Sequence, residues 1–111
     1  MNKKIKKISD YASYDDWAAA TIGSSKRQMD HFLKLALEDF EKDSDVAVLL
    51  IALRQIAKAK CGMAEISSKT GLTRESLYKI LSKDGNPTLT TFKAILDSLG
   101  YCLSVKNIRH A

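Results

Sequence analysis

The sequence is poor in the residues that interrupt helices. Its 111 residues include one proline, Pro87, and five glycines, so most of the chain is free to be helical. No apolar run approaches the roughly 20 residues that cross a bilayer, and we expect no membrane span. The basic start of the chain is not followed by an apolar segment of the secretory type. We therefore expect a cytoplasmic protein.

Patterns typical of enzymes and metal sites are also missing. The spacing of Cys61, Cys102, His31 and His110 matches no metal site, and two cysteines are too few for a disulfide scaffold. The chain has no glycine-rich phosphate loop and no plausible catalytic triad. His31 does follow Asp30, but such a pair is common by chance. We expect two free thiols in a reducing compartment, no cofactor, no metal and no enzymatic activity.

The net charge of +5 is concentrated in one segment. Residues 54–83 carry seven basic and two acidic side chains, whereas the rest of the chain carries eleven of each sign. Such a local excess can attract a polyanion such as nucleic acid. An ordinary solvated surface would give the same count, so charge alone leaves both interpretations open.

Apolar residues recur at helical spacing in three long segments. The first starts at Ser25, which has capping-box spacing to Gln28. The second follows Asp43 or Ser44 as its cap and ends near Gly62, and the third runs from a Thr88 cap to Gly100. The predicted stripes are Met29, Phe32, Leu33, Ala36, Leu37 and Phe40; then Val46, Leu49, Leu50, Leu53, Ile56 and Ala57; then Leu89, Phe92, Ile95, Leu96 and Leu99.

The two ends of the chain differ from this helical middle. Apolar and polar residues alternate over 101–106, which predicts one short strand. A lone strand needs a partner strand, which a second chain can supply. Residues 1–24 are weakly periodic and contain Tyr11, Tyr14 and Trp17. These aromatics suggest an arm that packs on its own domain or on a partner.

Residues 63–81 have the pattern of a helix-turn-helix, in which two short helices pack at a steep angle across a tight turn. We expect helices over Met63–Thr70 and Thr73–Leu81. Gly71 can adopt the positive φ needed to leave the first helix, and Thr73 can cap the second. Ser67 is small where the helices approach each other. The residues expected to face the core are Ile66, Leu72, Leu77 and Ile80.

The buried positions of the second helix fix its outward face. A recognition helix places its N-terminal residues at the base edges of the major groove. Arg74 can bind guanine in a bidentate manner and Glu75 can accept from a cytosine amine, while Lys79 and Lys83 suit phosphates. The predicted DNA-binding residues are Thr73, Arg74, Glu75, Ser76, Tyr78, Lys79, Lys83 and Asn86. The alternative is a pair of solvated amphipathic helices.

Residues 56–105 resemble regulators of the Xre, Cro and phage-repressor class, in which a five-helix bundle carries the motif in its second and third helices. Four stretches narrow the resemblance: Ile56-Ala-Lys-Ala-Lys60, Gly71-Leu-Thr-Arg-Glu-Ser-Leu-Tyr-Lys79, Gly85-Asn-Pro87 and Thr90-Thr-Phe92. Together they are similar to addiction-module antidote proteins, the HigA-like antitoxins encoded beside RelE/HigB-type toxins. The match covers about residues 32–106.

This resemblance implies an all-α, five-helix lambda-repressor-like bundle. The chain departs from the family pattern in its longer N-terminal region, residues 1–25, so we expect the bundle to carry an N-terminal extension, and the alternation over 101–106 adds a short C-terminal strand. We expect an arm over 1–24, a helical DNA-binding domain over 25–106 with the motif at 63–81, and a tail over 107–111. The implied function is an antitoxin that neutralises a RelE/HigB-like toxin and represses its own operon. Two alternatives are a phage or mobile-element repressor without a toxin, and a toxin inhibitor that acts through protein contacts alone.

The resemblance also implies a homodimer on palindromic operator DNA. Geometry favours the same assembly, because a two-fold dimer reads two half-sites about one helical turn apart. The C-terminal strand or the last helix can supply the interface.

Overall fold

Residues 25–108 are the part of the chain that the structure, a computed structural model, describes, and they form an all-α fold of five helices. The predicted N-terminal arm and its aromatics lie outside this range. In chain order the helices are α2 (Lys26–Asp43), α3 (Val46–Lys60), α4 (Met63–Thr70), α5 (Arg74–Ile80) and α6 (Leu89–Ser98). No helix within residues 25–108 is long and apolar enough to cross a membrane.

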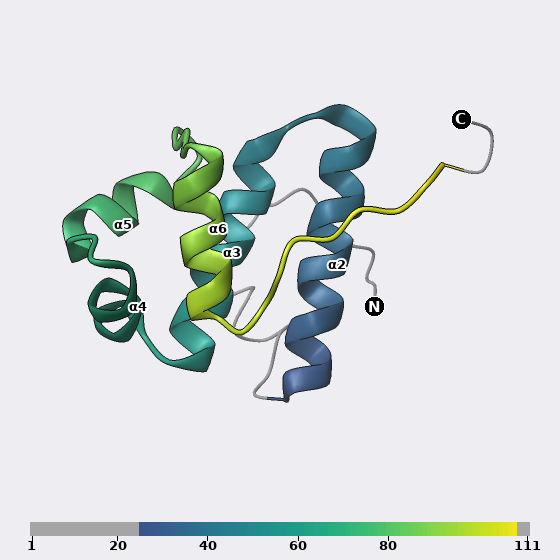
Figure 1. The fold of residues 1–111 in the computed structure, drawn as a ribbon. Coiled ribbons are helices and arrows are strands. Elements are labelled where there is room, and N and C mark those ends of the chain that lie inside the picture. The colour runs from purple at the N-terminus through teal and green to yellow at the C-terminus, as the bar shows by residue number, and fades with distance from the viewer. Residues whose placement is uncertain (1–24, 109–111) are drawn as a thin grey trace, which may run out of the picture.

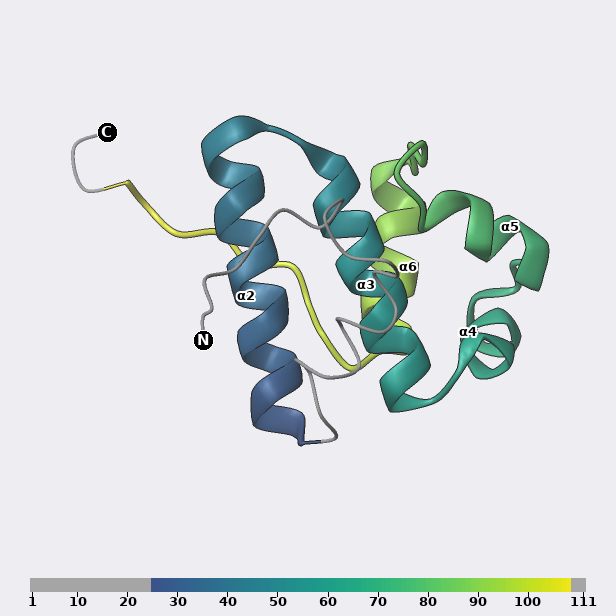
Figure 2. The same cartoon turned by 180° about the vertical axis from the view of Figure 1, so that it is seen from behind.

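The central helix of the bundle is α3. Figures 1 and 2 show α2 on one side of it and the α4–α5 pair at the opposite end, with α6 beside α3. Neighbouring elements cover α3 on more than one side, because its buried residues span more than half of its circumference at about 100° per residue. These residues are Leu49, Leu50, Ala52, Leu53, Gln55, Ile56 and Ala57. The core holds α4 and α5 away from α2, so the two ends of the molecule present different surfaces.

Side-chain caps start four of the five helices. Ser25 accepts from the backbone N–H of Gln28, as the sequence predicts. The expected cap of α3 is wrong, because Asp45 fills that role by accepting from Ala47 at 3.0 Å. Ser44 instead ends α2 with a φ of 60°. Helix α3 therefore starts one residue later than a Ser44 cap would place it, and two residues later than an Asp43 cap would.

The predicted burial fails at two positions of the apolar stripes. Leu37 of α2 is 40% exposed and Leu89 of α6 is 73% exposed. Leu37 lies at the flank of the stripe on α2, and Leu89 is the first residue of its helix, where no neighbouring element covers it. Both belong to helices whose other stripe residues pack on the core.

The C-terminal segment leaves α6 through a Schellman turn. Gly100 has a φ of 88° and donates to Asp97 at 3.0 Å, while Tyr101 donates to Leu96 at 2.9 Å. The chain then crosses α2 without strand pairing, as Figures 1 and 2 show. The predicted strand over 101–106 is therefore absent, because the described residues offer it no strand to pair with.

Candidate nucleic-acid interface

The chain bends sharply at Gly71, between α4 and α5. Gly71 has a φ of 80° and donates to the Ser67 carbonyl at 2.9 Å. The Ser67 hydroxyl donates to the carbonyl of Leu72. Thr70 donates its hydroxyl to Ile66 at 2.8 Å and accepts from the Leu72 N–H at 3.2 Å. These bonds fix the angle at which α5 leaves the turn, and the half-buried Ser67 contributes to them as a hydrogen-bond donor.

Buried side chains hold α5 against the rest of the fold. Ile66 of α4, Leu77 of α5 and Leu81 just after α5 are fully buried. Leu72 and Ile80 are partly buried and pack on the same core. The predicted core-facing residues of the two short helices are thus confirmed. With Leu77 anchored, the N-terminal half of α5 can only present its other side to solvent.

Thr73 and Ser76 form the cap of α5. Thr73 accepts from the Ser76 N–H at 3.0 Å, and its hydroxyl donates to the Ser76 hydroxyl oxygen at 2.9 Å. Ser76 is also half-buried. Both side chains were predicted to contact DNA, and the structure gives both a structural task in starting the helix.

The remaining predicted residues of α5 are exposed. Arg74, Glu75, Tyr78 and Lys79 all reach solvent, with Tyr78 38% exposed. Within residues 25–108 no ion pair engages Arg74, Glu75 or Lys79. The structure thus gathers four of the eight predicted residues on the open side of one short helix. Because they are exposed and form no ion pair within residues 25–108, the Arg74 and Lys79 cations are available to a ligand.

The last two predicted residues follow α5 in the loop before α6. Lys83 and Asn86 are exposed there. Between them lies Gly85, whose missing side chain is a steric requirement: an ideal Cβ would overlap the Ile80 carbonyl oxygen and lie 3.1 Å from Leu50 Cδ1. The loop therefore passes tightly behind the end of α5 and fixes its position relative to α3.

Lys58 is a residue of this surface that the sequence did not single out. Its ammonium lies 5.6 Å from the centre of the Tyr78 ring, so α3 reaches the open side of α5 through a cation–π contact. The signal was invisible in the sequence because the two residues are joined only by the packing of α3 against α5. Lys58 therefore lies beside Tyr78, with its ammonium engaged by the ring.

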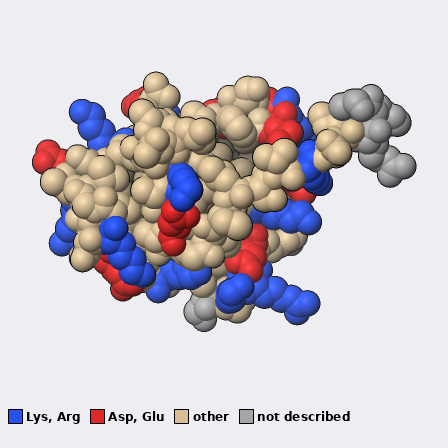
Figure 3. All heavy atoms as spheres, viewed as in Figure 1, with Lys and Arg blue, Asp and Glu red and all other residues tan. Residues whose placement is uncertain are grey.

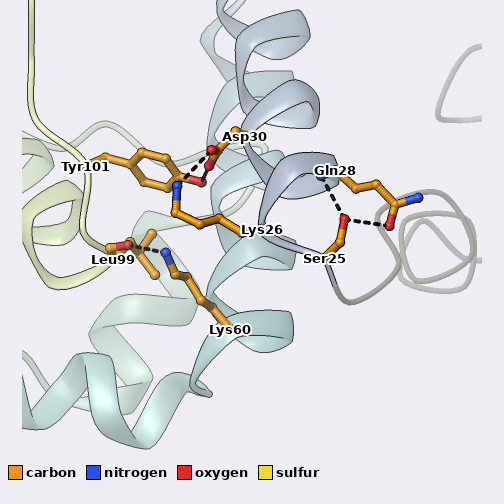
Figure 4. Close-up of polar contacts among 7 residues, drawn as sticks. All are labelled: Ser25, Lys26, Gln28, Asp30, Lys60, Leu99 and Tyr101. Atoms are coloured by element: carbon orange, nitrogen blue, oxygen red, sulfur yellow. Dashed lines mark hydrogen bonds and ion pairs between the residues drawn. The ribbon is translucent and has the colours of Figure 1, made fainter.

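The basic segment 54–83 does not form one continuous face. Lys69 pairs with Glu65 at 2.9 Å, and this bond raises the pKa of Lys69. Lys60 points the other way, donating to the Leu99 carbonyl at 2.8 Å and lying 5.0 Å from the centre of the Tyr101 ring (Figure 4). Acidic side chains also lie among the basic ones over the surface in Figure 3. The charge count alone therefore overstated the size of the basic surface.

The cysteine and carboxylate groups show no arrangement for metal chemistry within residues 25–108. Cys61 and Cys102 are free thiols. Burial, and next the nearby Glu65, raises the pKa of Cys61, so its thiolate is disfavoured. The Asp30 carboxylate accepts hydrogen bonds from Tyr101 and Lys26, so its partners are these two residues and not the adjacent His31.

Comparison with known proteins points to one family. A family model described as "Probable addiction module antidote protein" matches residues 13–107. A protein of Haemophilus influenzae described as uncharacterized is 34% identical over 79 residues, which cover 71% of this chain and 80% of that protein. No solved structure matches the chain.

Proposed function

Because the chain belongs to the family of probable addiction module antidote proteins, we propose that it is the antitoxin of a toxin–antitoxin module and a sequence-specific repressor of its own operon. In this proposal it neutralises a RelE/HigB-like toxin and binds operator DNA. It acts by binding alone, as a non-enzymatic cytoplasmic protein.

The observation that carries the DNA-binding half is the exposed side of α5. Arg74 and Lys79 lie there without ion-pair partners within residues 25–108, on a helix anchored by the buried Leu77. A rigid helix with unpaired cations on its open side has the shape and charge that the major groove accepts. Arg74, at the first position of α5, is suited to a bidentate contact with guanine, with Glu75 beside it as an acceptor for cytosine.

The other residues of the surface would position the protein on the DNA. Lys79 and Lys83 would neutralise phosphates, and Tyr78 and Asn86 would contact the backbone or a base edge. Thr73 and Ser76 support the interface chiefly by capping α5. In this proposal residues 25–106 are the DNA-binding domain and the reading element is α4–turn–α5.

We place the protein on its operator as a homodimer. One copy of α5 is seven residues long and covers a single half-site. A two-fold pair would read two half-sites about one helical turn apart. The exposed Leu89 at the start of α6 offers an apolar contact for such a pair.

The test compares two double variants of equal net charge. Arg74→Ala with Lys79→Ala removes two cations from α5, and Arg27→Ala with Lys42→Ala removes two exposed cations from α2 at the other end of the molecule. Binding to the DNA upstream of the gene is measured by fluorescence anisotropy at several salt concentrations. We expect the α5 variant to bind at least about tenfold more weakly and the α2 variant to bind almost as the natural chain does.

Equal losses in the two variants would reduce the interaction to non-specific charge attraction. Unchanged affinity of the α5 variant would reject the assignment of α5 as the DNA-binding element. A natural chain that does not bind this DNA at low salt would favour an inhibitor that acts on a toxin through protein contacts alone. A neighbouring gene that encodes no toxin would favour a stand-alone phage or mobile-element repressor.

A further inference from the structure

The segment after α6 carries exposed apolar side chains at alternate positions. Leu103 is 48% exposed and Val105 is 96% exposed, while Ser104 and Lys106 alternate with them. Ile108 is 73% exposed, but in this register it falls on the opposite face from Leu103 and Val105. Alternation of this kind belongs to a strand with one buried face, yet residues 102–108 pair with no strand of the described fold. The segment has the pattern of a strand without its sheet.

This segment, which we call the strap (residues 102–108), is held at its start. Tyr101 donates its hydroxyl to Asp30 of α2 at 2.7 Å, and Lys60 of α3 binds the Leu99 carbonyl at 2.8 Å (Figure 4). The Schellman turn at Gly100 fixes the direction in which the chain leaves α6. The strap therefore departs from a defined point at the end of α6 and runs across α2, away from α5 (Figure 1), so folding fixes where a partner would meet it.

A second copy of the chain is a poor occupant for the strap. The described part of that copy contains no strand, so it could offer only its own strap. Two paired straps would make an isolated two-stranded ribbon, which is marginally stable in water. A partner that already has a β-sheet with an open edge would instead extend that sheet by one strand and cover Leu103 and Val105 on one face.

We propose that the strap is the attachment site for the toxin, and that it binds by adding a strand to an exposed edge of a β-sheet in that toxin. This inference rests on the proposed antitoxin function, because the family implies a toxin partner. Main-chain hydrogen bonds from residues 102–108 would supply affinity, and the side chains of Leu103 and Val105, on one face of the strand, would supply specificity. Operator DNA and toxin would then occupy opposite ends of one small domain.

The test is a proline scan of the full chain from residue 102 to residue 106, with alanine at each position as the matched control. In an edge strand only alternate N–H groups point at the partner, and proline removes the N–H. Binding is measured against the protein encoded by the neighbouring reading frame of the module, by isothermal titration. At every second position we expect proline to weaken binding about two- to tenfold more than alanine does. At the positions between them, proline and alanine should have similarly small effects.

Operator binding and thermal unfolding serve as controls in the same variants. Both should stay unchanged, because the strap lies after the last helix and away from α5. Hydrogen exchange gives an independent readout: alternate amides over 102–108 should become protected only when the partner is added.

Three outcomes would overturn the proposal. Proline effects without a two-residue period would show that the strap is not paired as a strand. Protection of the strap amides in the isolated chain would show that residues 1–24 cover the strap. Protection that rises with protein concentration would show instead that a second copy covers it. If the natural chain binds the neighbouring protein and all proline variants bind equally well, the strap assignment fails while the antitoxin function stands; if the natural chain does not bind it at all, both fail.

Discussion

Replacing Gly85 with alanine should destabilise the fold through one steric clash. Gly85 lies in the loop behind α5, and an ideal Cβ would overlap the Ile80 carbonyl oxygen and lie 2.7 Å from the carbonyl carbon. These are backbone atoms at the end of α5, so neither can rotate away as a side chain would. Leu50 of α3, fully buried, blocks movement on the other side at 3.1 Å.

The size of the effect follows from this overlap. Forcing extra volume into a packed region costs about 1–3 kcal/mol. For a domain of this size that corresponds to a fall in Tm of roughly 5–20 °C. Relief of the clash also requires the end of α5 to shift. We therefore expect the Gly85→Ala protein to bind the operator more weakly even at temperatures well below its Tm. Thermal unfolding followed by circular dichroism at 222 nm measures the first effect, and anisotropy measures the second.

Gly71 provides the matched control because it is needed for a different reason. Its φ of 80° disfavours a side chain, yet a Cβ there would meet nothing within 4 Å. Alanine at Gly71 should therefore cost about 1–2 kcal/mol, and asparagine, which tolerates this conformation, should cost less. At Gly85 the order reverses, because asparagine is larger than alanine. A Gly85→Ala protein with a Tm close to that of the natural chain would refute the steric reasoning.

Two further predictions concern the cap of α5 and the anchor of the strap. Thr73→Ala should lower stability by about 1 kcal/mol and Thr73→Ser should restore most of it, as measured by urea unfolding. Burial and the bond to Asp30 raise the pKa of Tyr101 above its ordinary value of about 10. Tyr101 therefore contributes stability that is present below pH 10 and is lost as the pH rises through the folded pKa. A titration of tyrosinate absorbance should lose its last-ionising group in Tyr101→Phe; an unchanged titration would contradict the contact.

Most of the helical fold could be predicted from the sequence, because its signals are local. The caps at Ser25, Thr73 and Thr88 depend on residues three positions apart, and the turn at Gly71 depends on one backbone angle. The apolar stripes likewise place the core of α3 correctly. Each of these features is decided within one or two helical turns.

The features that the sequence did not yield depend on contacts between distant segments. Lys58 meets Tyr78 only because α3 and α5 pack together, and Asp30 meets Tyr101 across 71 positions of the chain. The expected strand after Gly100 failed for the same reason, since strand formation requires a neighbour that a periodic pattern cannot supply. The exposure of Leu89 likewise depends on what lies near the start of α6 rather than on its spacing.

The most direct measurement of the central claim is protection of guanine N7 from dimethyl sulfate on the DNA upstream of the gene, because N7 lies in the major groove. If α5 reads that groove, the natural chain should protect guanines in two patches about one helical turn apart. Arg74→Ala should lose protection at one guanine in each patch at a concentration that still saturates the site. Absence of major-groove protection in the bound complex, or an identical pattern with Arg74→Ala, would contradict the account.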